Sequence, residues 1–90
     1  MENKKITYKN LLKEEEYFLK KFGEKVRFYR LTKKKYSQLD LSLESGLDKN
    51  YIGGVERGER NITILKAKQL ADSLEVDIKD LFEKGEQTNV

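Results

Sequence analysis

The sequence predicts a compact all-α domain of five helices. Three observations carry this prediction: the chain has no proline, it has few alternating β-branched residues, and its apolar residues recur at helical spacing. At 90 residues a single domain is expected, with a core small enough to favour a partner subunit. The helices are expected at residues 11–32, 38–45, 49–57, 64–74 and 78–84.

The longest predicted helix, residues 11–32, carries its apolar residues on one side of a helical wheel. Gly23 leaves open whether this helix is continuous or broken. Residues 1–9 show little pattern and are expected to form a basic arm. The apolar residues of the stripe are Leu11, Leu12, Phe18, Leu19, Phe22, Val26 and Tyr29.

The four shorter helices each follow a residue that is suited to an N-cap. Its side-chain oxygen can accept a hydrogen bond from a backbone N–H that has no partner inside the helix. The first and last of these caps precede an acid three residues later, Asp40 and Asp80, which is the pattern of a capping box. The predicted caps are Ser37, Asp48, Thr63 and Asp77.

The composition excludes several kinds of chemistry. The chain has no cysteine and no histidine, so thiolate or imidazole zinc sites, disulfides and Cys–His or Ser–His catalytic pairs are excluded. Carboxylates could still hold Mg²⁺, but we find no catalytic constellation, cofactor motif or small-molecule site, and we expect no enzyme. No membrane span or signal peptide is evident, and a cytoplasmic protein is expected.

The charge of the chain is unevenly distributed. The formal net charge is +3, but residues 1–35 hold 12 Lys and Arg against 5 Asp and Glu. Residues 36–60 and 61–90 each carry an excess of two acids. This asymmetry indicates either a basic surface for a polyanion or a solvated, lysine-rich helix.

The helices at residues 38–45 and 49–57 are short and almost touch. Gly46 lies between them and tolerates the left-handed conformation that a sharp turn requires. This spacing predicts a helix-turn-helix, whose second helix enters the major groove of DNA. The alternative is a generic pair of antiparallel helices in a small bundle.

The second of these helices has an outer face that is suited to DNA. With Ile52 and Val55 facing the core, Asn50 and Arg57 lie on the opposite side, and Lys49 stands in the first turn. Asn can pair with adenine, Lys can donate to guanine, and Arg57 can reach a phosphate.

Gly53 and Gly54 are unusual inside a helix, where each costs about 1 kcal/mol relative to Ala. Either they let the backbone approach the DNA closely, or the helix is already ending there.

Next to these glycines, Glu56 lies toward the core and needs a partner, for which Arg30 of the first helix is the candidate. We expect this pair to be a structural clamp between the first and third helices.

Several segments of the chain resemble the phage-repressor-like, Cro-type (XRE) helix-turn-helix family. Residues 47–63 look most like the controller proteins of bacterial restriction–modification systems. The matching segments are FGEKVR (22–27), SQLDL (37–41), GLDKNYIGGVERG (46–58) and the late pattern of Leu70, Ala71, Leu74, Glu75, Val76, Leu81 and Phe82.

The resemblance implies a lambda-repressor-like DNA-binding domain over residues 22–84 that forms a homodimer on a palindromic operator in double-stranded DNA. Residues 1–21 would be an N-terminal extension and residues 85–90 a flexible tail.

The resemblance also implies roles for individual residues. Lys49 and Asn50 would read base edges, and Tyr51 would lie along the sugar–phosphate wall or a deformed base step. The residues that would hold the DNA backbone are Ser37, Gln38, Arg57, Arg60 and Asn61. The dimer interface would use Ile78, Leu81 and Phe82.

The chain departs from the family pattern in two places. The turn at residues 32–36 is one residue longer, lacks the family's glycine and carries three lysines, which are either phosphate contacts or a solvated loop. The extension before Phe22 is also longer, and it would be a DNA-reaching arm, part of the first helix or a second dimer contact.

The resemblance to controller proteins implies a timing switch. The protein would activate its own promoter and that of the endonuclease at low concentration, helping RNA polymerase, and would repress when an adjacent weaker site fills. The alternatives of the same fold are a phage-type repressor and the antitoxin of a toxin–antitoxin pair. An alternative of another class is a helical protein-interaction module that does not bind DNA.

Overall fold

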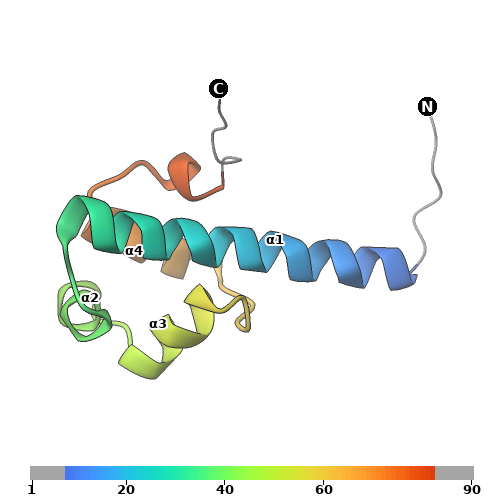
Figure 1. The fold of residues 1–90 in the computed structure, drawn as a ribbon, viewed down its shortest axis with the longest axis horizontal. Helices are drawn as coiled ribbons and strands as arrows, with labels where there is room; N and C mark the ends of the chain where they lie inside the picture. Colours follow the sequence, from blue (N-terminus) through green and yellow to red (C-terminus); the bar gives the residue numbers. More distant parts are fainter. Residues whose placement is uncertain (1–7, 83–90) are drawn as a thin grey trace.

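A long first helix forms one side of the domain, and the shorter helices pack along its C-terminal half (Figure 1). The computed structural model describes residues 8–82. The N-terminal half of α1 extends beyond the other helices in Figure 1. The elements are α1 (Tyr8–Tyr29), the π-helical turn η1 (Arg30–Lys34), α2 (Gln38–Ser45), α3 (Lys49–Glu56), α4 (Ile64–Leu74) and the 3₁₀ turn η2 (Ile78–Leu81).

The predicted all-α fold is confirmed, but the fifth helix is a single 3₁₀ turn. Hydrogen bonds of the i→i+3 type define it, from Asp80 N–H to Asp77 O at 2.9 Å and from Phe82 N–H to Lys79 O at 3.0 Å. The described chain ends at residue 82, so the predicted end at 84 and the tail at 85–90 lie outside the described residues, as do residues 1–7 of the basic arm.

The first helix ends differently from the prediction. It begins at Tyr8 and runs without a break to Tyr29, and η1 then widens the helix so that Tyr36 N–H reaches Arg30 O at 2.9 Å. Lys35 closes this turn with φ 57°, a conformation that suits glycine better than lysine. The turn that lacks the family's glycine therefore carries backbone strain at Lys35.

The lysines of this turn have different surroundings. Lys34 forms an ion pair of 2.9 Å with Glu75, the residue that ends α4. The hydrogen bond to Glu75 raises the pKa of the Lys34 amine, and the same bond lowers the pKa of the Glu75 carboxyl. Lys33 and Lys35 are exposed. Lys34 therefore joins η1 to the end of α4.

The N-caps predicted for α2, α3 and α4 are present. Ser37 and Asp40 form a reciprocal capping box with two hydrogen bonds of 2.9 Å. The Asp48 carboxylate accepts from the N–H groups of Asn50 and Tyr51, at 2.8 and 3.2 Å. At the last of the three, Thr63 accepts from Lys66 N–H at 3.1 Å. These caps fix where the two helices of the helix-turn-helix begin.

Gly23 marks the closest approach between α1 and α3. A Cβ placed on Gly23 would contact the carbonyl oxygen of Val55 and would lie 2.6 Å from that of Glu56. Only glycine lets the last turn of α3 pack directly on the backbone of α1. The glycine that raised the question of a helix break is therefore a packing site in a continuous helix.

The core lies between α1, the helix-turn-helix and α4. The ionised side chains of Arg30 and Glu56 are buried beside it, at 7% and 4% exposed. No helix within residues 8–82 is long and apolar enough to cross a membrane. The buried hydrophobic residues are Phe22, Val26, Leu41, Leu47, Ile52, Val55, Ala67, Leu70, Ala71, Leu74 and Leu81.

Replacing Gly23 with alanine tests this packing. Alanine is the better helix former by about 1 kcal/mol, so an unpacked site would gain stability. Because the added methyl would meet two backbone carbonyls, we expect the free energy of unfolding to fall by roughly 1–3 kcal/mol instead. Urea unfolding measures this, with Arg27→Ala on the exposed side of α1 as the control. Higher stability in Gly23→Ala would contradict the packing.

Candidate nucleic-acid interface

The segment from α2 to α3 forms the predicted helix-turn-helix. Gly46 adopts φ 78° and donates its N–H to Ser42 O at 2.9 Å, which ends α2. The inner sides of the pair are buried, with Leu41 and Ile52 fully covered and Leu47 at 7% exposed. The structure therefore holds α3 at a fixed angle to α2, with its opposite face turned away from the core.

The first turn of α3 presents polar side chains to solvent. Lys49 and Asn50 are both exposed, and within residues 8–82 no side-chain hydrogen bond or ion pair occupies either of them. The donors of Lys49 and the amide of Asn50 are therefore available. Long or amide side chains at the N-terminal end of such a helix are the groups that read base edges.

Tyr51 lies between two cations. The Arg60 guanidinium is 5.3 Å from the centre of its ring, and the Lys66 amine is 5.4 Å from it. Burial raises the pKa of the Tyr51 hydroxyl, and the charge of Arg60 opposes that rise. Sequence reasoning did not single out Lys66, because its place beside Tyr51 depends on how α4 packs.

The two glycines of α3 make room for side chains of the same surface. A Cβ on Gly54 would lie 2.9 Å from Arg60 Nε, and a Cβ on Gly53 would lie 3.2 Å from Arg57 Nη1. Both glycines lie in the last turn of α3, which ends at Glu56. Both glycines are buried by the neighbouring side chains in the free protein.

The remaining residues expected at the DNA backbone are spread around α3. Arg57 pairs with Glu59 at 3.1 Å, and both side chains are about 60% exposed, so this pair contributes little to stability. Ser37 and Asn61 are exposed, although the Ser37 hydroxyl is engaged as the N-cap of α2. Arg57 can therefore leave the carboxylate of Glu59 and bind a DNA phosphate at a low cost in free energy.

Arg30 and Glu56 form the ion pair that the sequence analysis proposes as a clamp. Arg30 Nε lies 2.7 Å from Glu56 Oε2, and Nη2 lies 2.9 Å from Oε1, with side chains only 7% and 4% exposed. The third nitrogen, Nη1, donates to Tyr36 O at 2.9 Å. This geometry is bidentate, and every guanidinium nitrogen has an acceptor.

Gln38 belongs to the same network. Its amide nitrogen donates to Glu56 Oε1 at 3.0 Å, so one carboxylate joins η1, α2 and α3. The family resemblance implies that Gln38 contacts the DNA backbone, and its bond to Glu56 is not predicted from the sequence. Because the amide oxygen of Gln38 lies over Gly53, the clamp also positions Gln38 at the surface of α3.

The acids of this segment are largely engaged. Residues 36–60 carry an excess of two acids, yet Asp40 and Asp48 serve as caps, Glu56 pairs with Arg30 and Glu59 pairs with Arg57. The exposed side of α3 and its flanks therefore present cations, although the segment is acidic as a whole.

The residues expected at a dimer interface are not equivalent. Leu81 is 1% exposed, because η2 packs against α1 and α4 and places this side chain in the core, so the expectation that Leu81 faces a partner is wrong. Ile78 is partly buried and Phe82 is 39% exposed. Only these two retain surface for a second chain.

Comparisons with known proteins agree with this geometry. A family profile described as helix-turn-helix matches residues 26–81. Control protein C.BamHI of Bacillus amyloliquefaciens is 40% identical over 62 residues, which cover 69% of this chain and 76% of that protein.

Solved structures give the same match. The crystal structure of the restriction-modification controller protein C.AhdI from Aeromonas hydrophila superposes with a TM-score of 0.67 at 45% identity, covering 71% of this chain and 96% of that one. The controller protein C.Esp1396I, crystallised as a tetramer with its natural 35 base-pair operator, has a TM-score of 0.63 at 33% identity, covering 74% and 97%.

The clamp can be tested by removing its carboxylate. Glu56→Ala leaves the buried Arg30 without its counter-charge, which should cost roughly 3–5 kcal/mol of stability. For a domain of this size that loss lowers the melting temperature by roughly 12 °C or more. Glu59→Ala, which breaks the exposed pair with Arg57, is the control and should change stability by less than about 1 kcal/mol. Equal melting of the two variants would refute the structural role of the clamp.

Proposed function

Because the chain belongs to the helix-turn-helix family and, within it, to the controller proteins of restriction–modification systems, we propose that it controls such a system by placing α3 in the major groove of an operator. It is a DNA-binding transcriptional regulator and not an enzyme. The observation that carries the proposal is the exposed first turn of α3, where Lys49 and Asn50 have no competing partners within residues 8–82.

Base recognition is assigned to the exposed start of α3. Lys49 donates to the acceptors of guanine, Asn50 pairs with adenine, and Tyr51 lies along the sugar–phosphate wall or a deformed step. Gly53 and Gly54 add no side chain of their own, so the backbone of α3 approaches the duplex once Arg57 and Arg60 swing toward phosphates.

Backbone contacts set the position of α3 on the duplex. Around the recognition residues, the Ser37 hydroxyl, the amides of Gln38 and Asn61 and the guanidinium groups of Arg57 and Arg60 hold phosphates. The placement of Lys66 beside Tyr51 supports adding it to this set. These contacts are insensitive to sequence and make binding dependent on salt.

Operator binding is proposed to involve a homodimer. A dimer places two α3 helices about one helical turn apart on a palindromic site. The relative C.Esp1396I was crystallised as a tetramer with a 35 base-pair operator, a length that supports the binding of two adjacent dimers. Ile78 and Phe82 are the proposed apolar contacts between subunits.

The regulatory scheme follows from two adjacent sites. Occupancy of the stronger site activates transcription of the protein's own gene and that of the endonuclease by helping RNA polymerase. As the protein accumulates, the weaker site fills and blocks the polymerase, which makes the circuit a timing switch.

Mobility shifts with DNA from upstream of the protein's own gene test this proposal. We expect two successive shifts as protein concentration rises, and weaker binding as salt rises. Lys49→Ala should reduce discrimination between operator and unrelated DNA, whereas Arg57→Ala should weaken both alike and lower the salt slope by about 0.9. Glu44→Ala, on the exposed side of α2, is the control. A single complex that is insensitive to salt, or no complex, would contradict the proposal.

A further inference from the structure

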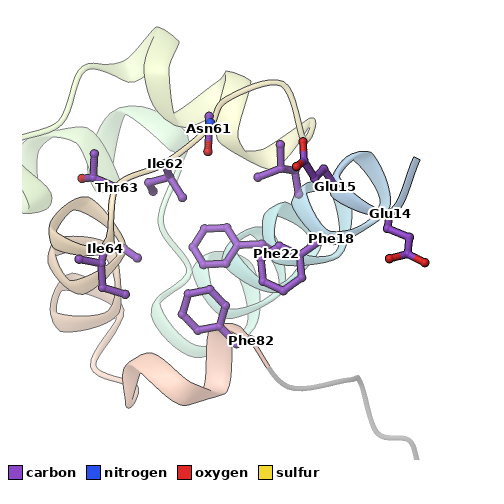
Figure 2. Close-up of a pocket in the computed structure, with 11 residues that line it drawn as sticks. Glu14, Glu15, Phe18, Phe22, Asn61, Ile62, Thr63, Ile64 and Phe82 are labelled. Atoms are coloured by element: carbon purple, nitrogen blue, oxygen red, sulfur yellow. The ribbon is translucent and has the colours of Figure 1, made fainter. Parts of the chain in front are cut away.

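An apolar groove lies at the junction of α1, the start of α4 and η2. It has a volume of about 640 Å³, and we call it the phenylalanine groove. Figure 2 shows Phe18, Phe22 and Phe82 converging there, with Glu14 and Glu15 at one end. Its apolar lining consists of Phe18, Leu19, Phe22, Ile62, Ile64 and Phe82, together with Ala67.

Part of this groove comes from residues that precede the match to the family profile. The match to C.AhdI covers 96% of that protein but only 71% of this chain, and the family profile begins at residue 26. Phe18, Leu19 and Phe22, which α1 supplies to the groove, lie before that start. The groove therefore combines residues inside the profile match with residues that precede it.

The aromatic rings of the groove form a ladder that ends at the surface. Phe22 is buried, and its ring centre lies 5.1 Å from that of Phe82, which in turn stacks on Phe18 at 5.9 Å. Phe18 is 51% exposed and Ile64 is 66% exposed. A large aromatic residue that is half covered at the end of such a ladder leaves apolar surface for another molecule.

The proposed dimer needs more surface than η2 offers. A stable interface buries about 800 Å² on each partner. Of the residues expected there, Leu81 is already in the core, and Phe82 is partly covered by Phe18 and Phe22. Because Phe82 also lines the phenylalanine groove, an interface that includes it continues directly onto α1.

The charges of α1 favour an antiparallel partner of the same kind. Glu14, Glu15 and Glu16 lie before Phe18, whereas Lys20, Lys21, Lys25 and Arg27 follow it, with Glu24 as the one acid among them. Two antiparallel copies that cross at Phe18 bring each acidic end beside the basic end of the other. Glu14 and Lys21, four residues before and three residues after Phe18, lie on the same flank of it, so Glu14 of one copy comes beside Lys21 of the other across the contact.

We propose that the phenylalanine groove and the side of α1 around Phe18 form a self-association surface, on which α1 of a second copy packs antiparallel with Phe18 near the two-fold axis. The inference rests on the dimer of the proposed function and extends its interface from η2 to α1. The chain's own residues 83–90, EKGEQTNV, offer a single apolar side chain and are a poor match for the groove.

Sedimentation equilibrium of the full chain tests the apolar part. Phe18→Ser should weaken self-association at least about tenfold, since a central aromatic anchor is lost. Leu43→Ser is the matched control, because Leu43 is 74% exposed on α2, outside the groove, and should leave association unchanged. Equal association of Phe18→Ser and the wild type would overturn the proposal.

A charge-reversal cycle tests the antiparallel register without touching the core. Glu14→Lys and Lys21→Glu should each weaken association, and the double variant should recover it to within about threefold of the wild type, as a pairwise coupling requires. A double variant that associates no better than the single ones would exclude this register.

Operator shifts separate this inference from the proposed function. If the wild type dimerises and binds operator DNA, but Phe18→Ser dimerises equally well, the proposed self-association surface on α1 is wrong. The proposed function as a regulator is then still supported. If the wild type associates but does not shift operator DNA, and Phe18→Ser abolishes that association, the self-association surface is supported and the proposed function is wrong.

Discussion

The position of α3 depends on a single buried ion pair. Arg30 and Glu56 are almost completely removed from solvent, so each would be costly without the other. The Arg30 guanidinium also holds Tyr36 O, and the Glu56 carboxylate also holds the Gln38 amide. One pair of charges thereby joins η1, the entry to α2 and the end of α3. The proposed recognition helix is therefore held in place through its last residue.

The contact at Gly23 acts at the same junction. Because glycine lets the carbonyls of α3 rest on α1, the end of α3 has little freedom to move, while its first turn stays exposed. Rigidity at one end and exposure at the other suit a recognition helix. The nearby acids act as N-caps or pair with arginines. Lys49, Arg57 and Arg60 therefore make the exposed surface of α3 positively charged.

The sequence predicts the local features of this protein well, but among the distant polar contacts of the described residues it predicts only the Arg30–Glu56 pair. Caps at Ser37, Asp48 and Thr63 are confirmed, because capping depends on neighbours within three residues. The resemblance also predicts the family, which the comparisons confirm. The π-helical turn, the 3₁₀ turn and the burial of Leu81 are missed because they arise from packing between elements. Lys66 beside Tyr51 and Gln38 on Glu56 are missed for the same reason.

The most direct test replaces the clamp with apolar side chains and measures DNA binding. In the double variant Arg30→Met, Glu56→Leu the melting temperature should stay close to that of the wild type, since buried ion pairs are often replaceable without loss of stability. Fluorescence anisotropy with the upstream operator should nevertheless show binding at least about tenfold weaker, or about 1.4 kcal/mol, because Gln38 and the end of α3 lose their anchor. A stable double variant that binds the operator as tightly as the wild type would contradict the account.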